Sequence, residues 1–215
     1  MRILLIGAGG MVGSRVATEA LRRGHDVVAV TRSGRADGVP PSPRLSRVSA
    51  DANDPKAVAE LAEGVDVVVA AVAPPRDGSP PTGPFLAVAS AIIDGTRESG
   101  TRRLVWVGGA GSLEVGGGMR LSDTADFPDA YKGEAAAQGE VLDVFREITD
   151  LDWTYVSPAA SIAPGERTGE FRVGANRLLT DAKGRSHISA EDYAVALVDA
   201  LESGDHVRER ITVAY

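Results

Sequence analysis

The chain has 215 residues, of which 43% are hydrophobic and 25% charged, which is typical of an ordinary globular protein long enough to bury a core. Its formal net charge of −7, with no basic run, argues against a nucleic-acid partner. The absence of cysteine excludes disulfides and thiolate chemistry, and three scattered histidines predict no metal site.

The chain begins on the apolar run Arg2–Ile6, which predicts a buried strand. We see no signal peptide before this run and no apolar stretch long enough to cross a bilayer. The sequence therefore predicts a cytoplasmic protein without a membrane partner.

Three glycines with the spacing G-x-x-G-x-x-G follow this strand, and residues Met11–Arg23 then place apolar side chains at helical spacing. A glycine turn between a strand and a helix lets a diphosphate approach the free N–H groups of the first helical turn. The alternative is an ordinary strand-to-helix turn without a ligand. The residues expected to contact a dinucleotide here are Gly7, Gly10, Met11, Val12 and Gly13.

Strand-like and helix-like segments alternate along the rest of the chain. Further strands are expected at Asp26–Val30, Ser46–Ser49, Val65–Ala70, Arg103–Val107 and Trp153–Val156. Helices are expected at Pro55–Ala62, Phe85–Glu98 and Ala130–Ile148. This alternation predicts an α/β fold with a Rossmann-like, doubly wound parallel sheet. We expect a single NAD(P)-binding domain over residues 1–215, with a small substrate-side subregion near the C-terminus.

The residues that end the second strand favour NADPH over NADH. No acid stands within Val28–Arg35 to bind the ribose hydroxyls, whereas Arg32 and Arg35 are placed to meet a 2′-phosphate, with Ser33 between them. The alternative is a solvated pair of arginines. After the third strand, Asp51 resembles the acid that contacts adenine in short-chain dehydrogenases, while Asn53 or Asp54 could cap the next helix.

A proline-rich stretch, Pro74–Pro84, follows the fourth strand and cannot be helix or central strand. It is expected to be a mobile loop beside the substrate pocket or, equally, a surface linker. The residues at the strand end just before it are predicted to line the dinucleotide site: Ala71, Val72 and Ala73.

Several runs together resemble one family. They are Val107–Leu113, Phe127–Lys132, Asp152–Ala159, Pro164–Gly169 and Ile188–Ala194. With the glycine turn, they resemble the atypical short-chain dehydrogenase/reductases known as NADH-flavin reductases, which are related more distantly to biliverdin reductase B and NmrA-like proteins. The resemblance implies NAD(P)H binding and reduction of a flavin. It also implies that backbone groups of Ser157, Pro158 and Ala159 hold the nicotinamide carboxamide.

The catalytic dyad usual in short-chain dehydrogenases, a tyrosine followed four residues later by a lysine, is absent. Residues 135, 159 and 197, four positions after the three internal tyrosines, are Ala, Ala and Leu. Lys132 follows Tyr131 directly, but helix neighbours point about 100° apart. A carbonyl or alcohol substrate would thus lack its proton relay. A flavin needs such a relay less, because its conjugated rings delocalise the arriving charge.

Two side chains are the candidates for contact with the electron acceptor. Ser112 corresponds to a serine at the fifth strand's end in related reductases, with a turn cap as its alternative, and Tyr131 could line the pocket or simply pack. Arg167 could steer an anionic acceptor, although a structural ion pair is favoured. Ser189 and Asp192 are expected to cap the last helix.

The combined hypothesis is an NAD(P)H-dependent reductase that transfers a hydride from NADPH, with NADH as an open alternative, to a flavin or another conjugated acceptor such as a quinone. The flavin is expected to be a substrate and not a tightly bound group, and the protein to be a monomer or homodimer. The alternative from another class is a non-catalytic NADP-binding redox sensor of the NmrA-like type. Sugar-nucleotide epimerases share the fold but need the missing dyad.

Overall fold

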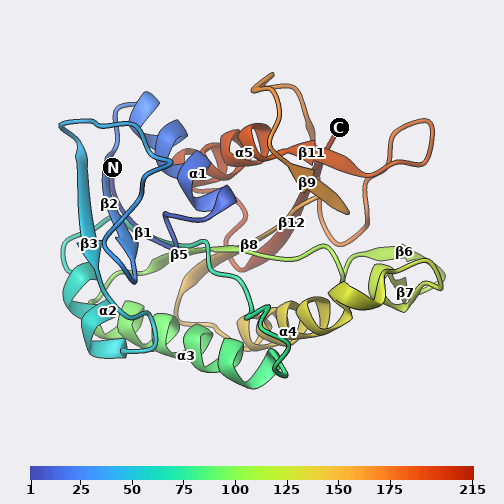
Figure 1. The fold of residues 1–215 in the computed structure, drawn as a ribbon, viewed down its shortest axis with the longest axis horizontal. Coiled ribbons are helices and arrows are strands. Elements are labelled where there is room, and N and C mark those ends of the chain that lie inside the picture. The colour runs from blue at the N-terminus through green and yellow to red at the C-terminus, as the bar shows by residue number, and fades with distance from the viewer.

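A computed structural model describes residues 1–215 and has one eight-stranded central sheet with helices on both faces (Figure 1). The strand order is β10-β12-β8-β5-β4-β1-β2-β3, and every pairing is parallel except that of β10 with β12. The strands of this sheet are β1 (Arg2–Ile6), β2 (Asp26–Thr31), β3 (Leu45–Ser49), β4 (Val67–Ala70), β5 (Arg103–Val107), β8 (Asp152–Ser157), β10 (Arg172–Gly174) and β12 (Glu209–Ala214).

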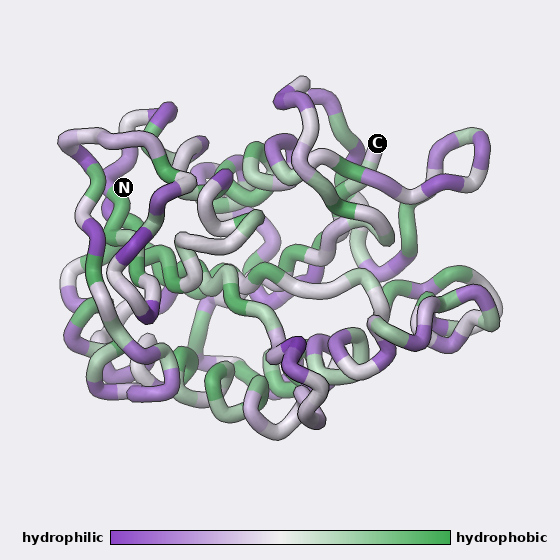
Figure 2. The backbone as a smooth tube through the Cα atoms, viewed as in Figure 1, coloured by the Kyte–Doolittle hydropathy of each residue, from purple (hydrophilic) through white to green (hydrophobic).

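The helices form two layers. Helices α1 and α5 pack together on one face, and α2, α3 and α4 cover the other (Figure 1). Each face has its own buried cluster of apolar side chains, and Figure 2 shows hydrophobic residues concentrated in the central strands. The helices are α1 (Met11–Arg22), α2 (Pro55–Ala62), α3 (Thr82–Glu98), α4 (Asp129–Arg146) and α5 (Ala190–Ser203).

Short elements decorate the ends of the later strands. The hairpin β6 (Glu114–Gly116) and β7 (Met119–Arg120) leads into a 3₁₀ turn, η1 (Leu121–Asp123). A second small sheet pairs β9 (Ser161–Ala163) with β11 (His187–Ser189) in parallel. These additions follow β5 and β8 in the chain.

The predicted α/β fold with a doubly wound, mostly parallel sheet is confirmed. All six predicted strands exist within two residues of their expected bounds. Five of them are compact apolar runs buried in the sheet, whereas β3, at its edge, has no buried residue. The predicted helices also exist. Asp54 caps α2 by accepting hydrogen bonds from the N–H groups of Lys56 and Ala57, and Ser189 caps α5 by accepting one from Asp192.

One prediction about the proline-rich stretch is wrong at its end. Helix α3 begins at Thr82, three residues before the expected Phe85, so Pro84 is helical. Proline is tolerated in a first helical turn, because its missing N–H would have no intrahelical partner there. The loop proper is therefore shorter than the predicted Pro74–Pro84.

The strand order reverses between β1 and β4, since the chain winds outward from β1 to β3 and then returns to build β4, β5, β8 and β12. Ligands of such sheets bind outside the carboxyl ends of the strands at this switch point. The turn after β1 and the residues after β4 lie there, which places a candidate site at the predicted glycines. Across the whole chain, no helix combines the length and hydrophobicity that a membrane crossing requires.

Candidate functional site

The turn between β1 and α1 is built from glycines that the packing requires. Gly7 has φ +86°, and a Cβ on it would lie 2.3 Å from the Ala71 carbonyl oxygen. A Cβ on Gly13 would lie 2.2 Å from the Gly7 carbonyl oxygen. These two glycines thus let the turn touch the end of β4 and let α1 touch the turn.

Gly10 has a different role, because it is the N-cap of α1 and a Cβ there would meet nothing closer than 3.5 Å. It provides no side-chain cap. The first-turn N–H groups at Met11, Val12 and Gly13 are therefore uncapped donors at the positive end of a 12-residue helix. This arrangement is suited to binding a diphosphate.

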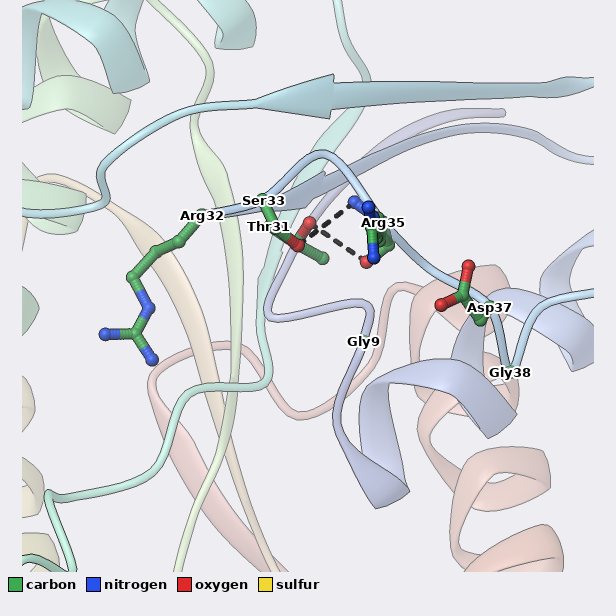
Figure 3. Close-up of a pocket in the computed structure, with 7 residues that line it drawn as sticks. All are labelled: Gly9, Thr31, Arg32, Ser33, Arg35, Asp37 and Gly38. Carbon is green, nitrogen blue, oxygen red and sulfur yellow. Dashed lines mark hydrogen bonds between the residues drawn. The ribbon is translucent and has the colours of Figure 1, made fainter.

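An open hollow of about 700 Å³ lies where β2 ends beside the glycine turn, and no hydrophobic side chain lines it (Figure 3). Its volume falls in the range of small-molecule pockets, about 300–1,000 Å³. It is lined by Gly9, Thr31, Arg32, Ser33, Arg35, Asp37 and Gly38.

Local hydrogen bonds shape the wall of this hollow and leave its cations free. The Thr31 hydroxyl donates to the Arg35 carbonyl oxygen at 3.0 Å, and the Ser33 hydroxyl accepts from the Arg35 N–H at 3.3 Å. Neither Arg32 nor Arg35 has a carboxylate within 4.0 Å of its guanidinium. The hollow therefore offers two unpaired positive charges to a ligand.

The two arginines do not form a fork. Figure 3 shows the Arg32 side chain directed away from Arg35. Arg32 instead lies near Asp51. Hydrogen bonds from Asn53 hold the pKa of the Asp51 carboxyl below its usual value, and the positive charge of Arg32 adds to this effect. Arg32 therefore lies near Asp51, and Arg35 lines another part of the hollow.

An acid also lines the hollow. Asp37 lies beyond the window Val28–Arg35 in which the sequence offers no acid, and its carboxylate is exposed and free of ion pairs. The loop between β2 and β3 folds back over the glycine turn and carries Asp37 with it, so that Gly38 approaches Ser14 of α1. Arg35 is thus opposed by a negative charge within the same hollow.

The other end of the crevice is formed by the residues after β4 and β8. The Ala71 N–H donates to the Ile6 carbonyl oxygen at 2.8 Å, which fixes the segment of Ala71, Val72 and Ala73 beside the glycine turn. Ser157 ends β8, and its buried hydroxyl has no hydrogen-bond partner, while Pro158 and Ala159 are buried. These segments share the carboxyl edge of the sheet with the glycine turn.

Tyr131 lies in the first turn of α4 and is 56% exposed. Beside it, Arg76 of the loop after β4 makes two hydrogen bonds of 2.9 Å to the Glu134 carboxylate. Lys132 instead pairs with Asp129 at 2.7 Å. The lysine adjacent to Tyr131 is therefore held by its own helix and does not join a catalytic dyad.

Ser112 lies apart from this edge. Its hydroxyl accepts a hydrogen bond of 2.9 Å from Arg210 on β12, and it lines a separate polar hollow against α4. The predicted contact of Ser112 with the acceptor stays a prediction.

Arg167 makes two hydrogen bonds, 2.8 and 2.9 Å, to Glu19 of α1, so the favoured structural ion pair is the observed arrangement.

Comparison with known proteins defines the family to which the chain belongs. The sequence model of a family described as NAD(P)H-binding matches residues 7–204, and the chain belongs to this family. The match spans the glycine turn, the hollow after β2 and all the later strands up to β11. The resemblance to NAD(P)H-binding reductases with a Rossmann-like fold is thereby confirmed.

Three solved structures have the same fold over essentially the whole chain. A "putative exported protein" from Burkholderia pseudomallei is 48% identical with a TM-score of 0.89, covering 100% of both chains. A "putative epimerase" from Bacteroides thetaiotaomicron is 39% identical with a TM-score of 0.91, covering 100% of this chain and 96% of the other. A "putative NADH-flavin reductase" from Streptococcus pneumoniae is 35% identical with a TM-score of 0.84, covering 100% and 99%.

Sequence reasoning missed three residues near the site. Asp37 follows Arg35 after only one residue, so a window two residues longer would have included it. Arg76 and Glu134 are 58 positions apart, and no local pattern relates them. Their pairing depends on the sheet placing the loop after β4 against α4.

Proposed function

We propose that this NAD(P)H-binding protein is a reductase that uses NADPH as its hydride donor. The observation that supports NADPH is the hollow after β2, in which the Arg32 and Arg35 guanidinium groups have no carboxylate partner. A 2′-phosphate would supply the missing anion through charge-assisted hydrogen bonds, each contributing about 1.5–3 kcal/mol. Ser33 would add a hydroxyl, and Asp51 would contact the adenine.

The remaining contacts follow from the carboxyl edge of the sheet. The uncapped N–H groups of Met11, Val12 and Gly13 would bind the diphosphate, with Gly7 and Gly10 leaving room for it. The segment from Ala71 to Ala73 would line the nicotinamide half. Backbone groups of Ser157, Pro158 and Ala159 would hold the carboxamide.

For the acceptor we propose a flavin or another conjugated molecule such as a quinone, bound as a substrate. Bound NADPH supplies a hydride, and a conjugated ring system takes it up with a proton from water. The chain contributes placement, because no tyrosine in it is followed four residues later by lysine and Lys132 is paired with Asp129. Tyr131, which is exposed on the first turn of α4 near Arg76 of the loop after β4, would meet the acceptor.

A second candidate is an NADP-binding sensor without turnover. It is favoured by one observation, which is that neither candidate catalytic group, Tyr131 or Ser112, has an acid–base partner. Lys132, the lysine next to Tyr131, is paired with Asp129, and the Ser112 hydroxyl accepts from Arg210. Epimerase chemistry, which one relative's name suggests, is disfavoured because the tyrosine–lysine dyad is missing.

Rapid mixing of the protein with NADPH and an excess of FMN, riboflavin or a quinone tests the proposal. We expect NADPH absorbance to fall at a rate that saturates with acceptor. Tyr131→Phe should raise the KM for the acceptor and leave the Kd for NADPH unchanged. The control Lys132→Gln, at the neighbouring residue, should change neither value. Tight binding of NADPH without consumption by any acceptor would favour the sensor.

A further inference from the structure

A basic hollow lies at the opposite end of the sheet from Arg32 and Arg35. Its floor is Arg210 of β12, which is 6% exposed. The guanidinium donates to the Asn176 side-chain and backbone oxygens at 2.9 and 3.1 Å, and to the Ser112 hydroxyl and carbonyl oxygens at 2.9 and 3.2 Å. All four acceptors are neutral, and no carboxylate lies within 4.0 Å of this buried cation.

Two more guanidinium groups border the hollow. Arg120 comes from the β6–β7 hairpin and Arg146 from the last turn of α4. Burial first, and then the neighbouring Arg146, lower the pKa of Arg210 from its usual value. The three positive charges therefore repel one another in a place where Arg210 has no carboxylate in direct contact, and Glu114 acts on it only at longer range.

The acids at the hollow do not balance this charge. Asp143 is engaged by Arg146 at 2.8 Å, and Glu114 is exposed and pairs with no cation. Three arginines against two carboxylates leave one excess positive charge in a hollow without a hydrophobic lining. An arginine that is buried without an anion is costly, so this site favours a bound anion.

The size of the hollow fits a small oxyanion. Its volume is about 230 Å³, which is the share of roughly seven to eight water molecules at about 30 Å³ each. Gly139 of α4 opens the space, because a Cβ there would meet only the Ser112 Cβ, at 3.9 Å. The Ser112 hydroxyl accepts from Arg210, which leaves its own hydrogen free to donate to a ligand.

The hollow is separate from the part of the candidate dinucleotide site that would take the 2′-phosphate. Five strand spacings lie between β12 and β2 in the sheet, which is about 24 Å at about 4.8 Å each. Arg210 is paired in register with Tyr155, in the middle of β8, and not at the carboxyl edge. The 2′-phosphate and this anion therefore cannot share one position.

We propose that Arg120, Arg146, Arg210 and Ser112 form a second binding site, which takes a phosphate group. The ligand is either free inorganic phosphate or the phosphate of a small molecule. Arg210 is the fixed floor, and Arg120 and Arg146 close over the anion from the surface. This site does not depend on the proposed reductase function.

Calorimetric titration of the full chain with inorganic phosphate at constant ionic strength tests the site. The variants Arg120→Gln and Arg146→Gln change exposed side chains, and each should weaken phosphate binding about tenfold, because each removes a charge-assisted contact. Arg102→Gln is the matched control, because Arg102 is also an exposed arginine, at 67%, and does not border the hollow; it should have no effect. Melting of each variant without phosphate verifies that it folds.

The double variant Arg32→Gln/Arg35→Gln separates the two sites. It should keep the phosphate affinity that Arg120→Gln loses. If phosphate binding disappears in the double variant and survives in Arg120→Gln and Arg146→Gln, or if no binding is detected, the proposal is overturned. Parallel titrations with FMN and riboflavin identify the source of the phosphate group. If FMN binds more tightly than riboflavin and Arg120→Gln abolishes this difference, the ligand is a phosphorylated small molecule. If inorganic phosphate binds but no such difference is seen, the ligand is the free ion.

Discussion

Glu19 of α1 and Arg167 of the segment between β9 and β10 are 148 positions apart and are joined by two hydrogen bonds, of 2.8 and 2.9 Å. Glu19 is only 4% exposed and also accepts from Arg22 and Arg23 of its own helix. One buried carboxylate thus ties the substrate-side segment to the helix whose N-terminus faces the proposed diphosphate.

Glu19→Gln should lower the free energy of unfolding by about 2 kcal/mol. Breaking a fully buried pair costs about 3–5 kcal/mol, and we expect less here because the Arg22 and Arg167 side chains are 54% and 37% exposed. Urea unfolding of the variant beside the wild type measures this. Glu63→Gln, on an exposed residue, is the control and should be neutral.

The same carboxylate should make stability depend on pH. The Arg167 hydrogen bonds hold the pKa of Glu19 far below its usual value of 4.5 in the folded state. Its stabilising contribution is therefore complete above the unfolded pKa and decreases as pH falls below about 4.5 toward the folded pKa. The wild-type Tm should fall more steeply than that of Glu19→Gln on acidification from pH 5. Parallel curves would contradict the assignment.

The opposed charges in the hollow predict opposite effects on cofactor choice. Arg35→Gln should weaken NADPH binding about tenfold and barely change NADH binding, because only NADPH carries the 2′-phosphate. Asp37→Asn should strengthen NADPH binding by about threefold, because it removes from the same hollow a negative charge that would repel the 2′-phosphate. Calorimetry with both cofactors measures the two ratios. Equal changes for NADPH and NADH would place the phosphate elsewhere.

The glycines of the first turn should separate folding from binding. Gly13→Ala should destabilise the fold by several kcal/mol, because its Cβ would overlap the Gly7 carbonyl oxygen at 2.2 Å. Gly10→Ala meets nothing closer than 3.5 Å and should unfold like the wild type. If a diphosphate binds here, Gly10→Ala should still weaken dinucleotide binding, which titration of the folded variant tests.

The pair of Arg76 and Glu134 should affect the loop more than the fold. Because Arg76 is 70% exposed, Arg76→Gln should change unfolding free energy by less than about 1 kcal/mol. The loop it anchors should become more accessible, so limited proteolysis within residues 74–81 should be faster. Arg97→Gln, which breaks an exposed pair with Asp150 away from the loop, is the control. Cleavage at unchanged rate would show that the pair does not anchor the loop.

The sequence by itself determined six of the eight strands of the central sheet, the first helix and the glycine turn between them. Local apolar runs decide which segments are buried strands, and β1 and the glycine turn need only adjacent residues to be recognised. The strand β12 was not anticipated. Its run of Arg210 and Thr212 alternating with Ile211 and Val213 mixes polar residues into a buried strand, and Arg210 lines the polar hollow at α4.

Only the tertiary structure decided which charges meet. Asp37 lines the same hollow as Arg35 because a loop folds over the glycine turn. Arg167 reaches Glu19 because α1 packs beside the segment after β9, and Ser112 is held by Arg210 because β12 joins β8. The contacts of Arg167 with Glu19 and of Arg210 with Ser112 join residues 148 and 98 positions apart, and no local spacing encodes them. Periodicity specifies which face of an element is buried, whereas the partner of each polar side chain depends on how the elements pack.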